Sequence, residues 1–217
     1  MRQLLLCGAL AGGLTAVSAH QVTAQTLTLA DDATMTSVSG RAGAQTYIGF
    51  SDTSRAVLGI TWWEDRDEPC KVETARIDLN TGDINKPETR LDGLTNLGSV
   101  KLGKKPCISP GDRKSARFSG TANFIYKLQV CTTDKKKTAK NKLKGIRIWP
   151  RTIASRSPLR LTDGKTKEEG RHAHCRDWHQ AVACPAGKIA SRLRVHHDNG
   201  ETKVIGLALE CRTLLLR

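Results

Sequence analysis

The chain has 217 residues and is strongly basic, with 35 Lys and Arg against 21 Asp and Glu and a formal net charge of +14. Its length is typical of one domain or two small ones, and only 38% of its residues are hydrophobic. After the N-terminal segment, no apolar run reaches the roughly 18–20 residues that span a bilayer. The composition therefore excludes an integral membrane protein, and the charge is nowhere dense enough to indicate a wholly disordered chain.

The first residues have the pattern of a secretory signal peptide. A short basic start precedes an apolar stretch from Leu4 to Val17, and small residues then offer cleavage after Ala19 or, alternatively, after Ala24. A buried N-terminal helix is the competing interpretation, but glycines in the stretch weaken such a helix. We therefore predict a secreted protein, either extracellular or periplasmic, with no transmembrane segment in the mature chain.

Removal of the signal leaves an even number of cysteines, namely Cys70, Cys107, Cys131, Cys175, Cys184 and Cys211. Six cysteines in an exported chain predict three disulfides, in one of 15 possible pairings. Their spacings are wide, and no Cys-x-x-Cys motif occurs. A zinc ribbon or a thioredoxin-type redox site is therefore not expected.

Short segments that alternate apolar and polar residues, separated by turn residues, indicate strands after about residue 37. Three pairs of segments share one pattern: 47–50 with 57–62, 126–130 with 143–148, and 191–195 with 204–209. Each pair is predicted to be a hairpin whose return strand carries a glycine at the same place, namely Gly59, Gly145 or Gly206. The clearest turn is Asp198-Asn199-Gly200, because Asn and Gly accept the positive φ of a tight hairpin turn.

Three hairpin repeats predict an all-β, β-prism-like fold, with three sheets around a pseudo-threefold axis and their apolar faces turned inward. A disulfide-linked β-sandwich, which would use the same strands in two sheets, is the alternative. In this interpretation residues 1–19 are the signal peptide, 20–36 an N-terminal extension, and 37–217 a single all-β domain with a basic loop region at 134–171.

Two neighbouring tryptophans end the return strand of the first repeat. Trp62 aligns with apolar residues of the other two repeats and is expected in the core, whereas Trp63 aligns with Trp149 on the opposite face. An exposed Trp63 or Trp149 could stack on a sugar ring. The alternative is that a core tryptophan is simply followed by a solvated acidic loop.

Carboxylates follow the same tryptophans. Glu64 and Asp67 could serve as the carboxylate pair of a polysaccharide hydrolase, although the sequence does not provide the distance between them. No Gly-x-Ser-x-Gly nucleophile elbow or phosphate-binding glycine loop is found. The sequence therefore favours a protein that is not an enzyme.

The excess positive charge is concentrated in residues 134–171, which hold 13 Lys and Arg against four Asp and Glu. This region begins with a lysine run in the turn of the second repeat, containing Lys135, Lys136, Lys137 and Lys140. It is interpreted either as a solvated loop or as an anion-binding face that works with Trp63 and Trp149. Acidic glycans, anionic cell-envelope polymers and an anionic membrane surface are the expected partners, whereas no motif supports nucleic acid.

A cluster of histidines precedes the third repeat. His172, His174 and His179 lie close together in the sequence, and imidazoles at this density can bind zinc or copper. Because Cys175 is expected in a disulfide, a polar loop with exposed histidines is the favoured interpretation. We therefore expect no metal and no other cofactor.

The third repeat has a recognisable series of motifs: Trp178, then Cys184-Pro185-Ala186-Gly187, then Leu193-x-Val195, and finally the segment Gly206–Cys211. Over residues 178–211 this series resembles the repeat of the vitelline membrane outer layer protein I family, which are secreted β-prisms. The resemblance implies a structural or sugar-binding role with no defined catalytic site.

In the frame of this repeat, Cys184 begins one strand of a hairpin and Cys211 ends the other. Antiparallel pairing through Asn199-Gly200 brings both to the same end. A Cys184–Cys211 disulfide is therefore predicted, with Cys70–Cys107 and Cys131–Cys175 by elimination.

Together these features predict a secreted, non-catalytic binding or structural protein that recognises a glycan or an anionic cell-envelope or extracellular polymer. The predicted ligand-binding residues are Trp63, Trp149, Lys135, Lys136, Lys137 and Lys140. A hydrolase that uses Glu64 and Asp67, and an adhesin or toxin-like protein that binds a partner through the same basic surface, are the alternatives.

Overall fold

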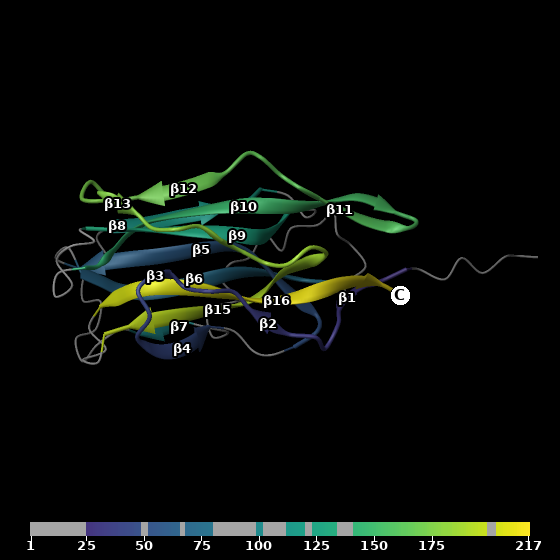
Figure 1. Ribbon diagram of the computed structural model, residues 1–217, viewed down its shortest axis with the longest axis horizontal. Coiled ribbons are helices and arrows are strands. Elements are labelled where there is room, and N and C mark those ends of the chain that lie inside the picture. The colour runs from purple at the N-terminus through teal and green to yellow at the C-terminus, as the bar shows by residue number, and fades with distance from the viewer. Residues whose placement is uncertain are drawn as a thin grey trace, which may run out of the picture.

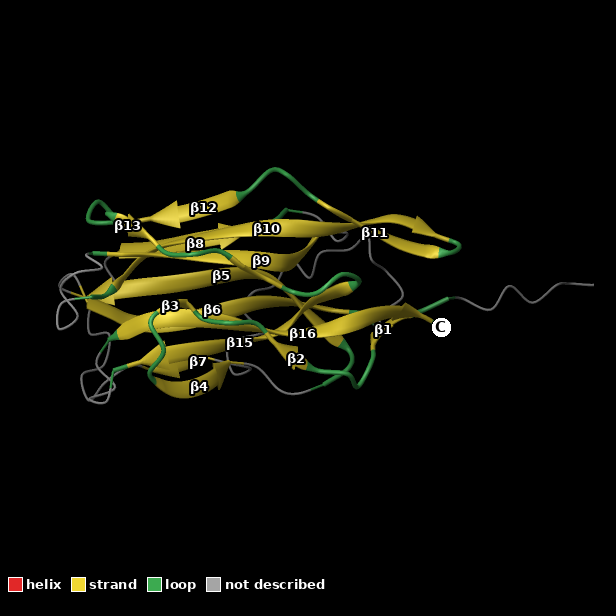
Figure 2. Cartoon of the chain, in the orientation of Figure 1, coloured by secondary structure: helices red, strands yellow, loops and turns green. Residues whose placement is uncertain are grey.

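The computed structural model describes residues 25–48, 52–65, 68–79, 99–101, 112–119, 123–133, 141–198 and 203–217. Every regular element in these ranges is a β-strand, as Figure 2 shows. No helix in the described part of the chain has the length and hydropathy of a membrane span. The prediction of an all-β fold is confirmed.

The strands form three antiparallel sheets that run along the long axis of the molecule (Figure 1). Sheet I has the order β7-β6-β5-β8, with β5 (Arg55–Asp65), β6 (Glu68–Asp78), β7 (Ser99–Lys101) and β8 (Asp112–Arg117). Sheet II has the order β11-β10-β9-β13, with β9 (Asn123–Thr132), β10 (Leu143–Arg156), β11 (Leu159–Asp163) and β13 (Asp177–Trp178); β12 (Glu168–Arg171) pairs with β10 and β14 (Val182–Ala183) with β9.

Sheet III contains both ends of the described chain. Its order is β1-β16-β15-β4, with β1 (Leu27–Leu29), β4 (Ala44–Ile48), β15 (Lys188–His197) and β16 (Val204–Leu216); β2 (Thr34–Met35) and β3 (Ser39–Gly40) also pair with β16. Each sheet thus has two long central strands with shorter strands on either side.

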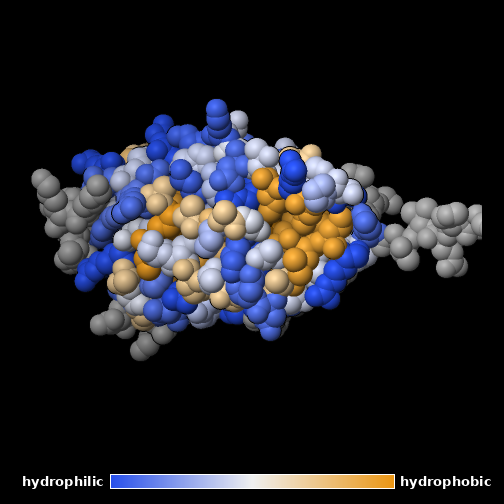
Figure 3. Space-filling view, turned by 45° about the vertical axis from the view of Figure 1, so that its right-hand side comes forward, coloured by the Kyte–Doolittle hydropathy of each residue, from blue (hydrophilic) through white to orange (hydrophobic). Residues whose placement is uncertain are grey.

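One hydrophobic core lies between the three sheets. Trp62 of sheet I, Leu128 of sheet II and Leu193 of sheet III are all completely buried in it. A second cluster lies where β1 and β16 meet the β10–β11 hairpin, and Figure 3 shows hydrophobic surface at this end of the molecule. A single core enclosed by three sheets is a β-prism, so the predicted fold is confirmed and the two-sheet sandwich is not observed.

The three repeat glycines occupy equivalent places in the central strands β5, β10 and β16. Each lies beside a shift of register in the pairing with the neighbouring long strand. A Cβ atom at Gly59 would come 2.8 Å from the Cβ of Arg117, and one at Gly206 would come 2.5 Å from a backbone oxygen. Gly59 and Gly206 are therefore required because neighbouring atoms approach them too closely for a side chain, whereas a Cβ atom at Gly145 would make a tight contact of 3.1 Å with the Cβ of Cys131.

Two of the three predicted hairpins are present and one is wrong. β9 pairs with β10, and β15 pairs with β16, as expected. The predicted first hairpin does not form, because β4 pairs with β15 in sheet III while β5 pairs with the following strand, β6. Alternation of apolar residues shows which face of a strand is buried but does not identify its partner.

The domain begins earlier than predicted, because part of the expected N-terminal extension is built into sheet III. Leu27 pairs with Leu216, and Thr34 pairs with Cys211. Both Leu27 and Leu29 are buried in the second cluster. Before the predicted domain, only residues 1–24 lie outside the described residues. They include the whole predicted signal peptide.

The basic region at 134–171 is largely strand rather than loop. Residues 143–163 form the long strand β10 and the hairpin with β11, and residues 168–171 form β12. Ile146 and Ile148 are buried in the core, and the residues between and beside them alternate with them as in the other repeats. The described basic residues of this region therefore lie mostly on strands of a sheet. The predicted binding lysines at 135–137 and 140 lie outside the described residues.

Two disulfides join the described cysteines. Cys131 on β9 pairs with Cys175, and Cys184 pairs with Cys211 on β16, in agreement with the predicted pairing. Cys107 and the side chain of Cys70 lie outside the described part, so the Cys70–Cys107 bond stays a prediction.

A buried basic side chain crosses each of the three seams between sheets. Lys144 of sheet II contacts Glu64 of sheet I, with 2.9 Å between Nζ and Oε2. Arg76 of sheet I donates to the carbonyl oxygen of Ser191 in sheet III at 3.2 Å. These two contacts join sheet I to sheet II and sheet I to sheet III.

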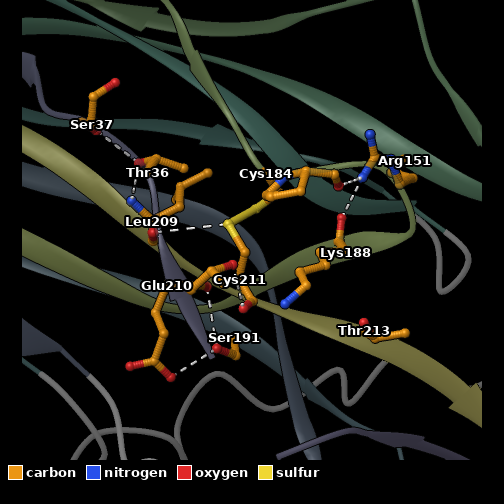
Figure 4. Close-up of a disulfide and its surroundings, with 12 residues drawn as sticks. Thr36, Ser37, Arg151, Cys184, Lys188, Ser191, Leu209, Glu210, Cys211 and Thr213 are labelled. Carbon is orange, nitrogen blue, oxygen red and sulfur yellow. Dashed lines mark hydrogen bonds between the residues drawn. A yellow bond between two sulfur atoms is a disulfide. The ribbon is translucent and has the colours of Figure 1, made fainter. Parts of the chain in front are cut away.

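Arg151 of sheet II crosses the third seam. Its Nη1 donates to the carbonyl oxygens of Pro185, at 2.6 Å, and of Lys188 in sheet III, at 2.5 Å. Figure 4 shows this guanidinium beside the segment that leads from Cys184 to Lys188. Its Nε and Nη2 donate to the carboxylate of Asp163, so the buried charge is paired.

Asp32 fastens the N-terminal segment to β15 and β16. It accepts hydrogen bonds from the backbone N–H of Thr213, at 3.0 Å, and from its hydroxyl, at 2.6 Å, and Lys188 Nζ lies 2.9 Å from Oδ2. Burial favours the neutral acid, but the Thr213 hydrogen bonds and the Lys188 charge outweigh it and lower the pKa of Asp32 to about 2.

We predict that Asp32→Asn lowers the free energy of unfolding by about 1 kcal/mol at pH 7, a small value because the carboxylate is partly exposed to solvent. A lowered pKa stabilises the fold above the unfolded-state value near 4, and this contribution disappears as the pH falls through about 2. Urea unfolding from pH 7 to pH 2 checks this. A difference between the two proteins that stays constant over that range would contradict it.

Candidate ligand-binding faces

Trp63 lies on the outer face of sheet I between two cations. It follows the buried Trp62 on β5 and is half-buried on the opposite side of the strand. In the register of the sheet it faces Lys71 on β6 and Arg113 on β8. Lys71 Nζ is 4.7 Å and Arg113 Cζ is 5.7 Å from the centroid of the indole ring.

Trp149 occupies the equivalent place on the outer face of sheet II. It follows the buried Ile148 on β10 and faces Lys127 on β9. Lys127 Nζ lies 4.7 Å from the centroid of the ring. The same pairing of an aromatic ring with a cation from the neighbouring strand thus occurs on two sheets.

Sheet II carries a second such pair. Arg147 Cζ lies 3.7 Å from the centroid of the Trp178 ring, whose Cη2 atom would lie 3.2 Å from a Cβ atom at Gly145. The bare backbone of the glycine therefore makes room for the ring.

The charge of Arg147 is not available in the same way as that of Lys127. Arg147 Nε donates to Glu169 Oε2 at 2.6 Å. Burial raises the pKa of Glu169, but the hydrogen bond and the charge of Arg147 outweigh it, so that the pKa is lowered and the carboxylate stays charged. The charge of Arg147 over Trp178 is therefore partly balanced by Glu169, which Lys167 and Arg171 also contact.

Arg113 and Lys127 differ from Arg147 in having no carboxylate partner within the described part of the chain. Among the residues that the structure describes, neither forms an ion pair with an acidic side chain. A cation above an aromatic ring gains about 0.5–1 kcal/mol at an exposed site. The ring also restricts a long basic side chain, so less conformational entropy remains to be lost when an anion binds. Each pair is thus a pre-ordered cation suited to a carboxylate, sulfate or phosphate group.

The structure brings the predicted site residues only partly together. Trp63 and Trp149 both lie on outer faces, but on those of different sheets. The basic partners were missed, because they are identified by the register between strands and not by any local motif. Lys71, Arg113 and Lys127 all lie outside the lysine run that the sequence singled out.

Glu64 does not have the environment of a catalytic carboxylate. It is only 6% exposed, and its two oxygens lie 2.9 Å from Lys144 Nζ and 3.5 Å from His172 Nε2. Lys144 is completely buried. This carboxylate therefore balances a buried lysine, and the hydrolase hypothesis loses its support from Glu64. Asp67, the second carboxylate of that hypothesis, lies outside the described residues.

The three histidines do not gather into a metal site. His172 is buried with its ring edge against Trp62, at 6.0 Å between centroids. His179 shares a hydrogen bond of 2.8 Å between Nε2 and the hydroxyl of Thr132. Within the described ranges, no group of three metal-binding side chains is found. The interpretation of an exposed histidine loop is wrong for His172, which belongs to the seam between sheets I and II.

Comparisons with known proteins found structural neighbours only. No family model and no curated protein matches the chain. Calystegia sepium agglutinin is 10% identical, with 83% of this chain and 96% of that one covered and a TM-score of 0.49. Frutapin, a lectin from Artocarpus incisa, is 7% identical, with 85% and 99% covered and a TM-score of 0.42.

The V. cholerae biofilm matrix protein Bap1 is 11% identical, with 87% of this chain but only 26% of that one covered and a TM-score of 0.42. None of these three is a vitelline membrane outer layer protein, so membership of that family stays a prediction. The β-prism assignment rests on the three sheets and the shared core of this chain.

The buried ion pair of Lys144 and Glu64 should contribute to the stability of the fold, and substitutions of the pair test this. Glu64→Gln should lower the free energy of unfolding by about 3–5 kcal/mol, because it breaks a buried ion pair between the carboxylate and Lys144 Nζ. Lys144 directly precedes the repeat glycine of sheet II, and the equivalent places before Gly59 and Gly206 hold the buried Leu58 and Ile205. Combining Glu64→Leu with Lys144→Met should therefore restore stability to within about 1 kcal/mol of the natural protein.

Urea unfolding of both variants at pH 7 measures these differences. A loss below about 1 kcal/mol in Glu64→Gln would show that the pair is not a structural tie.

Proposed function

We propose that this protein is an exported, non-catalytic binding protein for an acidic polysaccharide. The observation that supports the proposal best is the pair of outward cations, Arg113 and Lys127, which lie on Trp63 and Trp149 without a carboxylate partner among the described residues. A polymer with a charge on many of its units fits such a surface, because cations on a continuous sheet can meet several of its units.

The anionic character of the ligand follows from how the tryptophans are flanked. Trp63 lies between Arg113 and Lys71, of which Lys71 is paired with Glu73, and Trp149 lies under Lys127. A neutral sugar would have to displace these cations to stack on the rings and would offer them no charge in return. An acidic sugar can pair with the cations and leave their contacts with the rings intact.

Export and a non-catalytic role are parts of the same proposal. The signal-like N-terminus and the two disulfides both favour an oxidising compartment. Glu64, the carboxylate first considered for catalysis, is committed to Lys144 and His172. The predicted lysine run at 135–140 would add positive charge before β10 begins at Leu143.

Binding to alginate, a carboxylate-bearing polysaccharide, tests the proposal, with neutral dextran as the comparison. The natural protein should bind alginate at 50 mM NaCl and lose at least about tenfold in affinity at 500 mM, because salt screens exposed charges. The double variant Arg113→Gln with Lys127→Gln should lose about tenfold in affinity at low salt. Surface plasmon resonance with immobilised polymer measures both.

The matched control is Arg160→Gln with Lys165→Gln, which removes the same charge from exposed positions that do not lie on an aromatic ring. It should bind as the natural protein does. Equal losses in the two double variants would mean that net charge alone is responsible. Binding to dextran, or release of reducing sugar from alginate, would overturn the proposal.

A further inference from the structure

Sheet III carries an aromatic ring in the same setting as the rings of the other two sheets. Tyr47 on β4 is 41% exposed and is the one large hydrophobic side chain that is exposed among the described residues. It lies opposite Arg194 on β15, on the side of the sheet that faces away from the buried Leu193 and Val195. A large exposed ring at the edge of a sheet has no role in the core.

Two guanidinium groups flank this ring. Arg192 Cζ is 4.3 Å and Arg194 Cζ is 4.9 Å from its centroid. Arg194 Nη2 also donates to the hydroxyl oxygen of Tyr47 at 2.5 Å. The ring and the hydroxyl together hold Arg194 in one position, which is the arrangement already described for Trp63 between Lys71 and Arg113.

The two arginines differ in what balances their charge. Arg192 Nη1 lies 3.4 Å from Glu210 Oε2, and Glu210 also contacts Arg212. Arg194 forms no ion pair with any acidic side chain of the described residues. Burial lowers the pKa of the neighbouring His196, so that residue adds no charge at neutral pH. Arg194 is therefore the available cation of this face.

We infer that the outer face of sheet III is a third binding face for anionic sugar units, centred on Arg194 and Tyr47, and that one chain therefore binds three polymer segments. This rests on the proposed function of the other two faces. The three sheets surround one core, so their outer faces point in three different directions. A single polymer strand cannot follow all three without wrapping around the prism, and separate strands bound to separate faces are cross-linked.

The number of bound ligands tests the inference most simply. Equilibrium dialysis against a short oligouronate, too short to reach from one face to another, should find three bound per natural chain. Arg194→Gln should bind two, and Arg113→Gln with Lys127→Gln should bind one. Arg160→Gln, the matched control, should still bind three. Arg194→Lys, which keeps the charge but loses the planar group, should retain three with a weaker third site.

A bridging assay measures the consequence. Alginate beads should capture fluorescent alginate from solution when the natural protein is present, and the variant with all three cations replaced should capture none. Thermal unfolding should give Arg194→Gln the same midpoint as Arg160→Gln, because Arg194 forms no ion pair with an acidic side chain of the described residues and its hydrogen bond is to the exposed Tyr47. A lower midpoint for Arg194→Gln alone would assign this residue a structural role and overturn the inference.

Two outcomes separate this inference from the function on which it rests. In the first outcome, the natural chain and Arg194→Gln each bind two oligouronates, and the double variant Arg113→Gln with Lys127→Gln binds none. This result would support the proposed binding function but exclude the third face. No oligouronate bound to the natural chain would remove both.

Discussion

Three buried cations, one at each seam, tie the sheets of this prism together. Lys144 joins sheets I and II, Arg76 joins sheets I and III, and Arg151 joins sheets II and III. A charge in such a position is costly unless it is paired and hydrogen-bonded. Lys144 finds its carboxylate in the adjacent sheet, whereas Arg76 and Arg151 are paired with Asp52 and Asp163 and donate to carbonyl oxygens across the seam. The sheets are consequently held in one relative arrangement, and this arrangement directs their outer faces away from one another.

The seams also account for part of the positive charge of this basic protein. Some of its positive charges lie inside, as at the seams, and others are matched by carboxylates, as Arg147 is by Glu169. On the described outer faces, single cations held on aromatic rings differ from other exposed basic residues, such as Arg160 and Lys165. This is a more specific arrangement than a positively charged loop, because the position of each cation is set by the register of the strands beside it.

Much of the fold could be predicted from the sequence, since the signal was local. The three strands that contain Gly59, Gly145 and Gly206 have the same alternation of apolar residues. That alternation correctly placed Trp62 in the core. The first hairpin could not be predicted, because Tyr47 meets Arg194 across 147 positions of sequence. The short strand β1 lacked enough residues to show any alternation.

The candidate faces were only half predictable for the same reason. The alternation placed Trp63 and Trp149 outward, but their cationic partners depend on bulges that shift the register, as between Trp149 and Pro150. The lysine run drew attention because it is continuous in sequence. Lys127 and Arg113 are isolated in sequence and become significant only once the strands are paired.

The four tryptophans offer the most direct measurement, because each has one indole N–H signal in a nitrogen–proton correlation spectrum. Titration of labelled protein with oligouronate should shift the signals of Trp63 and Trp149 in a saturable way, because their rings carry the binding cations. The signal of Trp62, buried in the core, should stay in place. Unchanged signals for Trp63 and Trp149 at saturating ligand would contradict binding at these faces.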